Sequence, residues 1–241
     1  MEHIFEELDY QTTPFGEISL RRRTEPRLDN KLIYEVKLGE EFLMSSLFVE
    51  AEEQLSKLGL AQLRVNGLIE NLDIVVGGLG LGYTALTVLH STRVQRLRTI
   101  DVMQPVIAWH QRGILPIGNA LATEARSSLV HGDFFSIATD STIGFIDDKP
   151  VHAVLLDIDH SPRHWLNESN ADFYSASSLR TVAKKIISQG VFGLWSNDLP
   201  DEEFIVLLQS VFARVEAHVV SFPNPYSGGE STNTVYICTV L

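Results

Sequence analysis

The N-terminal part of the chain alternates apolar and polar positions in short runs. Residues 15–23 (FGEISLRRR) follow the two-residue period that is typical of a strand with one solvated face. This run ends in Arg21, Arg22 and Arg23, one of which should face away from the other two because side chains alternate along a strand. A group of three basic residues could hold a phosphate, but a solvated edge strand explains the arginines more simply.

The next segment predicts a hairpin and a helix. Residues 32–38 and 41–46 flank a Gly-Glu pair, which is typical of a hairpin with glycine at the first turn position. Residues 48–58 have the amphipathic spacing of a short helix, and Gly59 is expected to end it. Residues 1–60 are therefore predicted to form a small N-terminal β-hairpin appendage with a linking helix.

Beyond residue 61 the pattern changes to apolar runs in alternation with amphipathic ones. The expected strands are residues 73–76, 97–100, 128–130, 152–156, 191–195, 214–222 and 234–241. The expected helices are residues 82–90, 104–112, 172–188 (ended by Gly190) and 201–210. Strands that are apolar throughout are buried on both faces of a parallel sheet, and the last two strands read as an antiparallel hairpin. Residues 61–241 are predicted to form a doubly wound α/β domain with a seven-stranded, mostly parallel sheet and an antiparallel C-terminal edge.

A glycine-rich loop lies between the first of these strands and its helix. Gly78, Gly80 and Gly82 alternate along it, so the backbone can approach a ligand closely beside the free N–H groups of a helix N-terminus. The run from Gly80 to Ala85 also matches the G-x-G-x-x-G/A fingerprint of dinucleotide folds. The loop predicts nucleoside binding, with an NAD-binding enzyme as one alternative.

Acidic residues follow the next three strands. Asp101 lies nineteen residues after Gly82, the spacing at which a carboxylate accepts hydrogen bonds from a ribose diol. Gly132-Asp133 precedes two phenylalanines, a pairing suited to the amino edge and flat face of adenine, and Asp157-Ile158-Asp159 follows the fourth strand. In open α/β sheets ligands bind outside the carboxyl ends of the strands. The acid after the third strand and the terminal hairpin favour an S-adenosylmethionine-type fold over a dinucleotide fold.

Composition and charge narrow the choice of ligands and location. The net charge of −12 disfavours nucleic acid, whose binding depends on neutralised phosphates, and favours a cationic or neutral small molecule. The single cysteine, Cys238, can form no internal disulfide, which fits a reducing cytoplasm. The most apolar region, residues 68–89, is interrupted by polar residues, so neither a membrane span nor a membrane partner is expected. We expect a cytoplasmic protein.

These residues resemble the spermidine synthase (polyamine aminopropyltransferase) family, within the class I S-adenosylmethionine-dependent methyltransferase fold. The resemblance extends over nearly the whole chain and includes residues 222–229 (FPNPYSGG), which are similar to the family's loop before the last strand. It implies that Asp101 holds the ribose and Asp133 the adenine of S-adenosylmethionine or its decarboxylated form. By the same resemblance, Asp157 orients and deprotonates an attacking amine, and Tyr226 lines the amine pocket.

The chain departs from the family at three places. Leu81 stands where the family's glycine loop has an aspartate for the aminopropyl ammonium. Asp157 and Asp159 are two residues apart, whereas the family's pair is three apart. Phe48-Val49-Glu50 replaces the family's tyrosine–x–glutamate, which leaves Glu50 as the candidate contact to the amine. These departures put the donor and the acceptor in question more than the fold.

The expected chemistry is direct displacement at a sulfonium carbon by a neutral amine. Asp157 would act as the acid–base residue, with Asp159 or His160 as proton outlet, and Trp195 at the end of its strand would line the acceptor pocket. Asp157, Asp159, His160 and His164 could also form a metal site, but Pro162 interrupts the spacing and no metal is expected. The alternatives are a small-molecule methyltransferase and a catalytically degenerate nucleoside-binding scaffold. The exposed edge of the N-terminal hairpin predicts a homodimer.

Overall fold

An N-terminal sheet of four antiparallel strands begins the chain, of which the computed structural model describes residues 3–241. Its strands follow chain order and are β1 (Phe5–Thr13), β2 (Gly16–Glu25), β3 (Lys31–Leu38) and β4 (Glu41–Ser45). A single 3-10 turn (Pro26–Leu28) connects β2 to β3. The hairpin of β3 and β4 was predicted, whereas β1 was not, because its run FEELDYQTT has few apolar positions.

The added strand changes the setting of the arginines on β2. β1 and β3 pair with either side of β2, so the prediction of an edge strand is wrong. The predicted alternation holds: Arg22 bonds Glu6 at 2.8 Å, whereas Arg21 and Arg23 both bond Glu35, at 2.7 and 2.9 Å. Two arginines on an inner strand therefore share one buried carboxylate.

Helix α1 (Glu50–Val65) follows the N-terminal sheet and is longer than predicted. Gly59 lies inside it and does not end it. A Cβ at this position would lie 2.9 Å from Leu155 Cδ2, so the glycine lets α1 approach the second sheet closely. Leu55 and Leu63 lie on the buried face of the helix.

The second sheet has seven strands in the order β10-β11-β9-β8-β5-β6-β7. They are β5 (Leu72–Gly77), β6 (Val94–Asp101), β7 (Ser127–His131), β8 (Val151–Leu156), β9 (Ile186–Ser196), β10 (Arg214–Asn224) and β11 (Gly229–Thr239). β5 to β9 are parallel, and β11 runs antiparallel to both β9 and β10. The predicted α/β class and antiparallel edge are confirmed. Because the winding reverses at β5, the switch point of the sheet lies between the carboxyl ends of β5 and β8.

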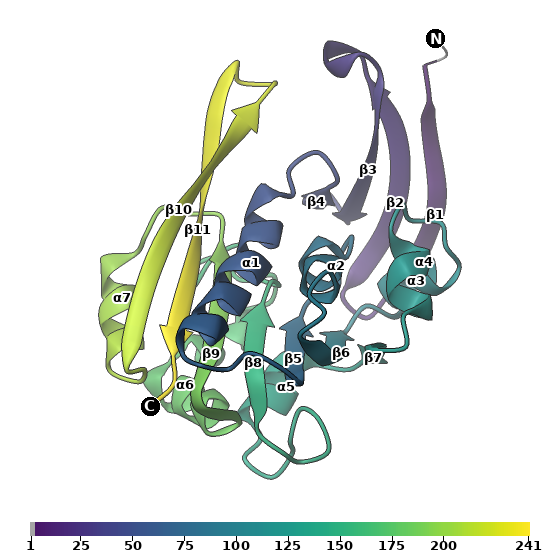
Figure 1. Ribbon diagram of the computed structural model, residues 1–241. Coiled ribbons are helices and arrows are strands. Elements are labelled where there is room, and N and C mark those ends of the chain that lie inside the picture. Colours follow the sequence, from purple (N-terminus) through teal and green to yellow (C-terminus); the bar gives the residue numbers. More distant parts are fainter. Residues whose placement is uncertain (1–2) are drawn as a thin grey trace.

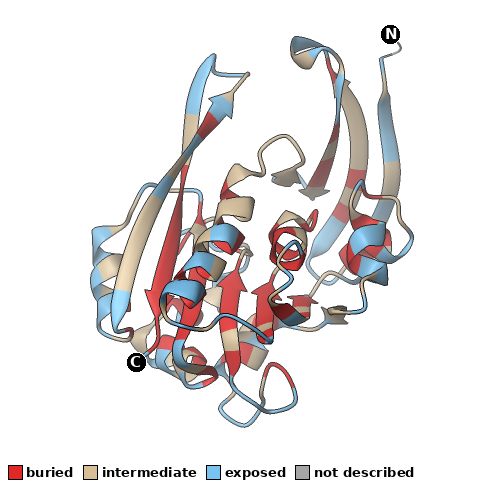
Figure 2. Cartoon of the chain, viewed as in Figure 1, coloured by how far each residue is buried: buried red, intermediate tan, exposed pale blue. Residues whose placement is uncertain are grey.

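Helices cover both faces of this sheet (Figure 1). The remaining ones are α2 (Tyr83–Leu89), α3 (Gln104–Gln111), α4 (Gly118–Thr123), α5 (Phe134–Thr139), a 3-10 segment (Glu168–Tyr174), α6 (Ala176–Lys184) and α7 (Glu202–Gln209). One apolar core lies under α1 to α4 and includes residues of the N-terminal sheet, and a second lies under α5 to α7. Figure 2 shows the central strands between these layers as buried.

The predicted helix over residues 172–188 is wrong in its extent. The chain forms the 3-10 segment first, and Ser175 then caps α6 by accepting a hydrogen bond from Ser178 N. Ile186 already pairs with Val151, so β9 begins there, and Gly190 lies inside this strand at an irregularity. The apolar residues that read as the end of a helix belong to the sheet.

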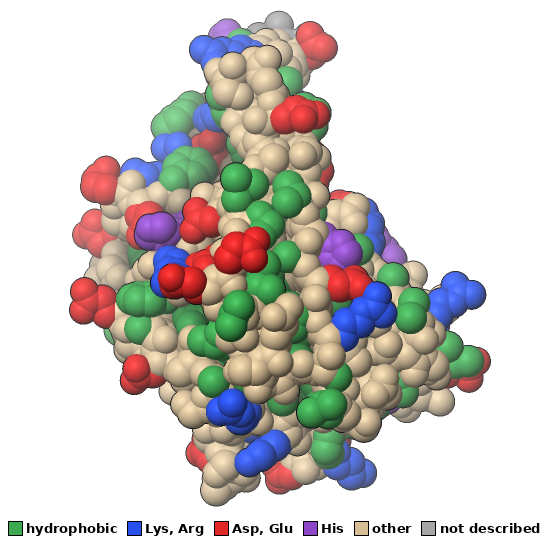
Figure 3. Space-filling view, turned by 90° about the vertical axis from the view of Figure 1, so that its left-hand side faces the viewer, with side chains coloured by type: hydrophobic (Ala, Val, Ile, Leu, Met, Phe, Trp, Pro, Cys, Tyr) green, Lys and Arg blue, Asp and Glu red, His purple; other side chains and the backbone are tan. Residues whose placement is uncertain are grey.

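The face that carries α7 and β10 is chemically mixed (Figure 3). Val206 of α7 and Val219 of β10 are exposed. Apolar side chains lie among acidic and basic ones on this face. No helix within residues 3–241 is long and apolar enough to cross a membrane.

Candidate active site

A cavity of about 1260 Å³ opens at the carboxyl ends of the parallel strands. The glycine-rich loop after β5 forms part of its wall, and the N-terminal sheet and the loop between β10 and β11 supply others. Its lining includes the predicted residues Gly78, Gly80, Gly82, Asp101, Asp133, Asp157, Trp195 and Tyr226. The cavity therefore lies at the switch point that the strand order defines.

The glycine loop adopts backbone conformations that disfavour side chains. Gly78 has φ of 93°, and a Cβ there would lie 1.9 Å from the carbonyl oxygen of Asp157. Gly80 and Gly82 also have positive φ, and Met44 Sδ would lie 2.8 Å from a Cβ at Gly80. Asp157 N donates to Gly77 O at 2.8 Å, which joins the ends of β8 and β5. Glycine is needed here for close packing of the loop as well as for access by a ligand.

Asp101, at the end of β6, braces this loop. Its two carboxylate oxygens accept hydrogen bonds from Leu79 N at 2.8 Å and Met103 N at 2.7 Å. Burial raises the pKa of Asp101, and the backbone N–H groups oppose that rise by stabilising the charged form. Each oxygen keeps a second lone pair, so the carboxylate can still accept hydrogen bonds from a diol.

Asp133 is exposed at the rim of the cavity and caps α5. It accepts hydrogen bonds from Phe135 N at 2.9 Å and Ser136 N at 3.2 Å. Gly132 does not line the cavity; its N–H donates to the carbonyl of Asp101 at 3.0 Å and ties β7 to β6. Asp133 thus combines a helix-capping role with a position at the ligand cavity, whereas Gly132 has a structural role at the end of β7.

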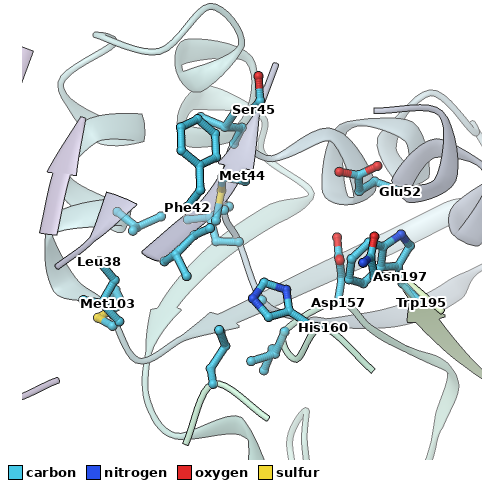
Figure 4. Close-up of a pocket in the computed structure, with 18 of the residues that line it drawn as sticks. Leu38, Phe42, Met44, Ser45, Glu52, Met103, Asp157, His160, Trp195 and Asn197 are labelled. Carbon is cyan, nitrogen blue, oxygen red and sulfur yellow. The ribbon is translucent and has the colours of Figure 1, made fainter. Parts of the chain in front are cut away.

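Two carboxylates approach each other beside the glycine loop. Figure 4 shows Glu52 of α1 and Asp157 after β8 on the same side of the cavity. Thr84 Oγ1 donates to Asp157 Oδ2 at 2.7 Å and lies 3.5 Å from the carbonyl oxygen of Glu52. Burial raises the pKa of Asp157 to about 6, against the effect of the Thr84 hydrogen bond. Burial and the nearby charge of Asp157 raise the pKa of Glu52 well above its usual value.

Besides Gly132, two other predicted site residues, Glu50 and Asp159, lie outside the cavity lining. Glu50 starts α1, and its Oε2 accepts a hydrogen bond from Val49 N at 3.0 Å. Asp159 is buried and accepts hydrogen bonds from Leu166 N, Asn170 Nδ2 and Tyr174 Oη at 2.8 to 2.9 Å. Asp159 therefore organises the loop after β8, whereas Asp157 faces the cavity.

The other predicted contacts to an acceptor do line the cavity. Tyr226 Oη accepts a hydrogen bond from Arg23 Nη2 at 2.7 Å and donates to Glu25 Oε2 at 3.0 Å. Its ring packs edge-on against Phe48, with centroids 6.1 Å apart. Trp195 Nε1 is buried and has no hydrogen-bond partner within residues 3–241.

His160 and His164 each pair with a different carboxylate. His160 lines the cavity and pairs with Glu41 at 3.0 Å, whereas His164 pairs with Asp198 at 3.3 Å. Across the part of the chain that the structure describes, no three His, Cys, Asp or Glu side chains group in a way that could hold a metal ion.

Among the cavity residues that sequence reasoning missed are Glu52, Arg21 and Arg23. The signal for Glu52 was present: it lies three residues before the apolar Leu55, and positions i and i+3 share a helix face. Anchoring the helix face on Leu55 would have selected Glu52 in place of Glu50. The two arginines required knowledge of β1, which makes β2 an inner strand.

The strand order, the glycine loop at the switch point and the terminal antiparallel strands define the class I methyltransferase-type fold. No protein-family model matches the sequence, and no curated protein matches it. Among solved structures, spermidine synthase from Thermotoga maritima is 13% identical with a TM-score of 0.71, over 98% of this chain and 73% of that one. A spermidine synthase in complex with the transition state analogue AdoDATO is 14% identical, with a TM-score of 0.69 over 98% of this chain and 72% of that one.

Human methyltransferase-like protein 13 in complex with SAH is also similar. It is 17% identical with a TM-score of 0.61, over 79% of this chain and 82% of that one. At these identities the comparisons show the fold, which is the one these transferases share. The likeness to the spermidine synthases extends to the N-terminal sheet, since it covers nearly the whole chain.

Proposed function

We propose that this protein transfers an alkyl group, of the aminopropyl kind, from a sulfonium adenosyl donor to an amine. The observation that carries the proposal is the pair Glu52 and Asp157, two partly buried carboxylates beside a glycine loop at the switch point. A cation placed between them would relieve their mutual repulsion and the cost of their burial. An alkyl ammonium is such a cation.

The strand ends offer a place for the donor nucleoside. In this proposal Asp101 holds the ribose diol, and Asp133 and Phe135, which line the same cavity, hold the adenine. The donor is decarboxylated S-adenosylmethionine in this proposal. This chain has Leu81 where the aminopropyltransferases that the sequence resembles have an aspartate for the donor's ammonium. In this proposal the acid pair binds the acceptor amine.

The protein's task is to supply a neutral amine in the correct orientation. The acceptor nitrogen forms a bond to the carbon attached to sulfur, the carbon–sulfur bond breaks, and its electron pair neutralises the sulfonium. Asp157 accepts the proton that the nitrogen loses, and a pKa near 6 suits a base that must be ionised at neutral pH. Position and orientation supply most of the remaining acceleration, because the sulfonium carbon is already activated.

A binding and transfer experiment tests this function. Calorimetric titration with decarboxylated S-adenosylmethionine, S-adenosylmethionine, methylthioadenosine and NAD identifies the donor, and mass spectrometry then detects transfer to primary amines. Glu52→Gln should reduce transfer about 10- to 100-fold, because it removes one charged contact to an ammonium. Glu50→Gln is the matched control, since Glu50 carries the same charge outside the cavity. Equal losses in both variants, or no loss in either, would contradict the proposal.

A small-molecule methyltransferase is the second candidate, and Leu81 favours it. This side chain is 5% exposed and leaves the glycine loop itself without a carboxylate. In that case intact S-adenosylmethionine would bind more tightly than its decarboxylated form, and a methyl group would be transferred. Binding of either nucleoside without any turnover would identify a nucleoside-binding scaffold.

A further inference from the structure

The cavity has a basic wall as well as an acidic one. Arg21 and Arg23 project into it from β2, on the face opposite Arg22. Glu35 of β3 holds both: its Oε2 lies 2.7 Å from Arg21 Nε, and its Oε1 lies 2.9 Å from Arg23 Nε. Each Glu35 oxygen therefore has an arginine partner, and the Glu35 side chain is only 3% exposed.

The two arginines differ in whether their terminal N–H groups have hydrogen-bond partners. Arg23 Nη1 donates to Glu25 Oε2 and Nη2 donates to Tyr226 Oη, each at 2.7 Å. The terminal amino groups of Arg21 make no hydrogen bond within residues 3–241. Arg23 is therefore satisfied by the protein, and Arg21 presents an open fork of N–H donors at the cavity wall.

Arg21 is also held in a defined orientation. Its guanidinium carbon lies 5.5 Å from the ring centroid of Phe5 and 5.5 Å from that of Phe42. With Nε fixed by Glu35 and the plane flanked by two rings, little freedom is left to lose on binding. A planar fork in this state matches the two oxygens of a carboxylate.

The acidic and basic side chains reach the cavity from different elements. Figure 4 shows Phe42, Met44 and Ser45 of β4 on one side and Glu52 and Asp157 on the other. Arg21 packs on Phe42 and is therefore on the β4 side. A guanidinium cation repels the second ammonium of a diamine and attracts a carboxylate.

We propose that the acceptor is an amine that also carries a carboxylate, an ω-amino acid, and that Arg21 binds this carboxylate. The inference rests on the proposed transfer to an amine and specifies the acceptor of that same site. The amino end faces Glu52 and Asp157 and receives the alkyl group, while the carboxylate end stays paired with Arg21. Arg21 is then a specificity-determining residue, because it separates amino acids from diamines.

Paired acceptors of equal length test this specificity. γ-Aminobutyrate is compared with putrescine, and δ-aminovalerate with cadaverine, in wild type, Arg21→Gln and Arg22→Gln. Arg22 is the matched control, since it is the adjacent arginine, faces away from the cavity and pairs with Glu6. We expect the KM for the amino acids to rise about 10- to 100-fold in Arg21→Gln, the loss of a charged bidentate contact, with kcat little changed. Arg22→Gln should leave both constants as in wild type.

The remaining outcomes separate this inference from the proposed function. Transfer to diamines in preference to amino acids would overturn the inference and leave the function standing. Calorimetric binding of γ-aminobutyrate to protein saturated with methylthioadenosine needs no turnover; binding that Arg21→Gln abolishes supports the carboxylate site even if no transfer occurs. If Arg21→Gln weakens intact S-adenosylmethionine but not its decarboxylated form, the arginine binds the donor's carboxylate and the acceptor assignment is wrong.

Discussion

Replacing Asp157 by asparagine should make the protein more stable at neutral pH while abolishing transfer. Burial raises the pKa of Asp157 from its usual 3.8 to about 6, so the folded state binds its proton more tightly than the unfolded state does. Between about pH 4 and pH 6 the unfolded state binds fewer protons, and the free energy of unfolding therefore falls as pH rises through this window. Above this pH window the ionised carboxylate lowers the free energy of unfolding by up to about 3 kcal/mol, because one pKa unit corresponds to about 1.4 kcal/mol.

Asparagine removes that cost and keeps an oxygen for the Thr84 hydroxyl, which donates to Asp157 Oδ2 at 2.7 Å. At pH 8 we expect a gain of about 1 to 3 kcal/mol, which corresponds to roughly 3 to 10 °C in melting temperature for a domain of this size. The charge of Asp157 also raises the pKa of Glu52, so its removal relieves Glu52 in the same direction. As the pH falls through the usual value of 3.8 the advantage should shrink and then vanish, because aspartate becomes protonated in both states.

Urea denaturation of wild type and Asp157→Asn at pH 4 and pH 8, followed by circular dichroism, measures this difference. Asp133→Asn is the control: its side chain is exposed at the same cavity, and asparagine caps a helix about as well as aspartate, so a change within about 0.5 kcal/mol is expected. An Asp157→Asn variant that is less stable than wild type at pH 8 would refute the reasoning. So would a gain that is the same at both pH values.

Three further results are expected. Gly78→Ala should lower the free energy of unfolding by about 3 kcal/mol or more, since its Cβ would lie 1.9 Å from the Asp157 carbonyl oxygen in a backbone of φ 93°. Gly39→Ala, where a Cβ would have nothing within 4 Å, should lower it by about 1 kcal/mol. Chemical denaturation compares the two variants, and equal losses would contradict the close approach. Tyr174→Phe removes one hydrogen-bond donor to buried Asp159, so it should lower the free energy of unfolding by about 1 to 3 kcal/mol without weakening nucleoside binding. Weakened nucleoside binding in calorimetry would place Asp159 in the site after all. We also propose that two copies of the chain form a dimer by pairing their β1 strands, which lie at the edge of the N-terminal sheet. Sedimentation equilibrium measures this, and a monomer at micromolar concentration would contradict the strand pairing.

Several features of this protein follow from its sequence alone. Apolar strands in alternation with amphipathic helices identify the doubly wound sheet, because burial on both faces imposes that pattern whatever the remaining contacts are. The glycines at 78, 80 and 82 mark the loop at the switch point, since few other residues tolerate its positive φ values. Asp101 and Asp157 could be placed at the cavity because the carboxyl ends of parallel strands meet at one edge.

The N-terminal sheet and the direction of the site's side chains depended on tertiary contacts. β1 is too polar to be recognised by its own period, and only its pairing with β2 makes that strand an inner one. The apolar run that ends at Gly190 fits a helix or a strand, and its pairing with Val151 decides for the strand. Short-range pattern is ambiguous in such segments because both structures bury the same residues.

The choice between neighbouring acids was also made by packing. Glu50 and Glu52 are alike in sequence, but α1 is rotated so that Leu55 and Gly59 meet the sheet, and this rotation carries Glu52 into the cavity. Asp157 and Asp159 follow the same strand, and the hydrogen bonds from Leu166, Asn170 and Tyr174 draw only Asp159 away. Sequence determined that acids gather at this edge of the sheet. The packing of a helix and a loop on that sheet determined which of them face the ligand.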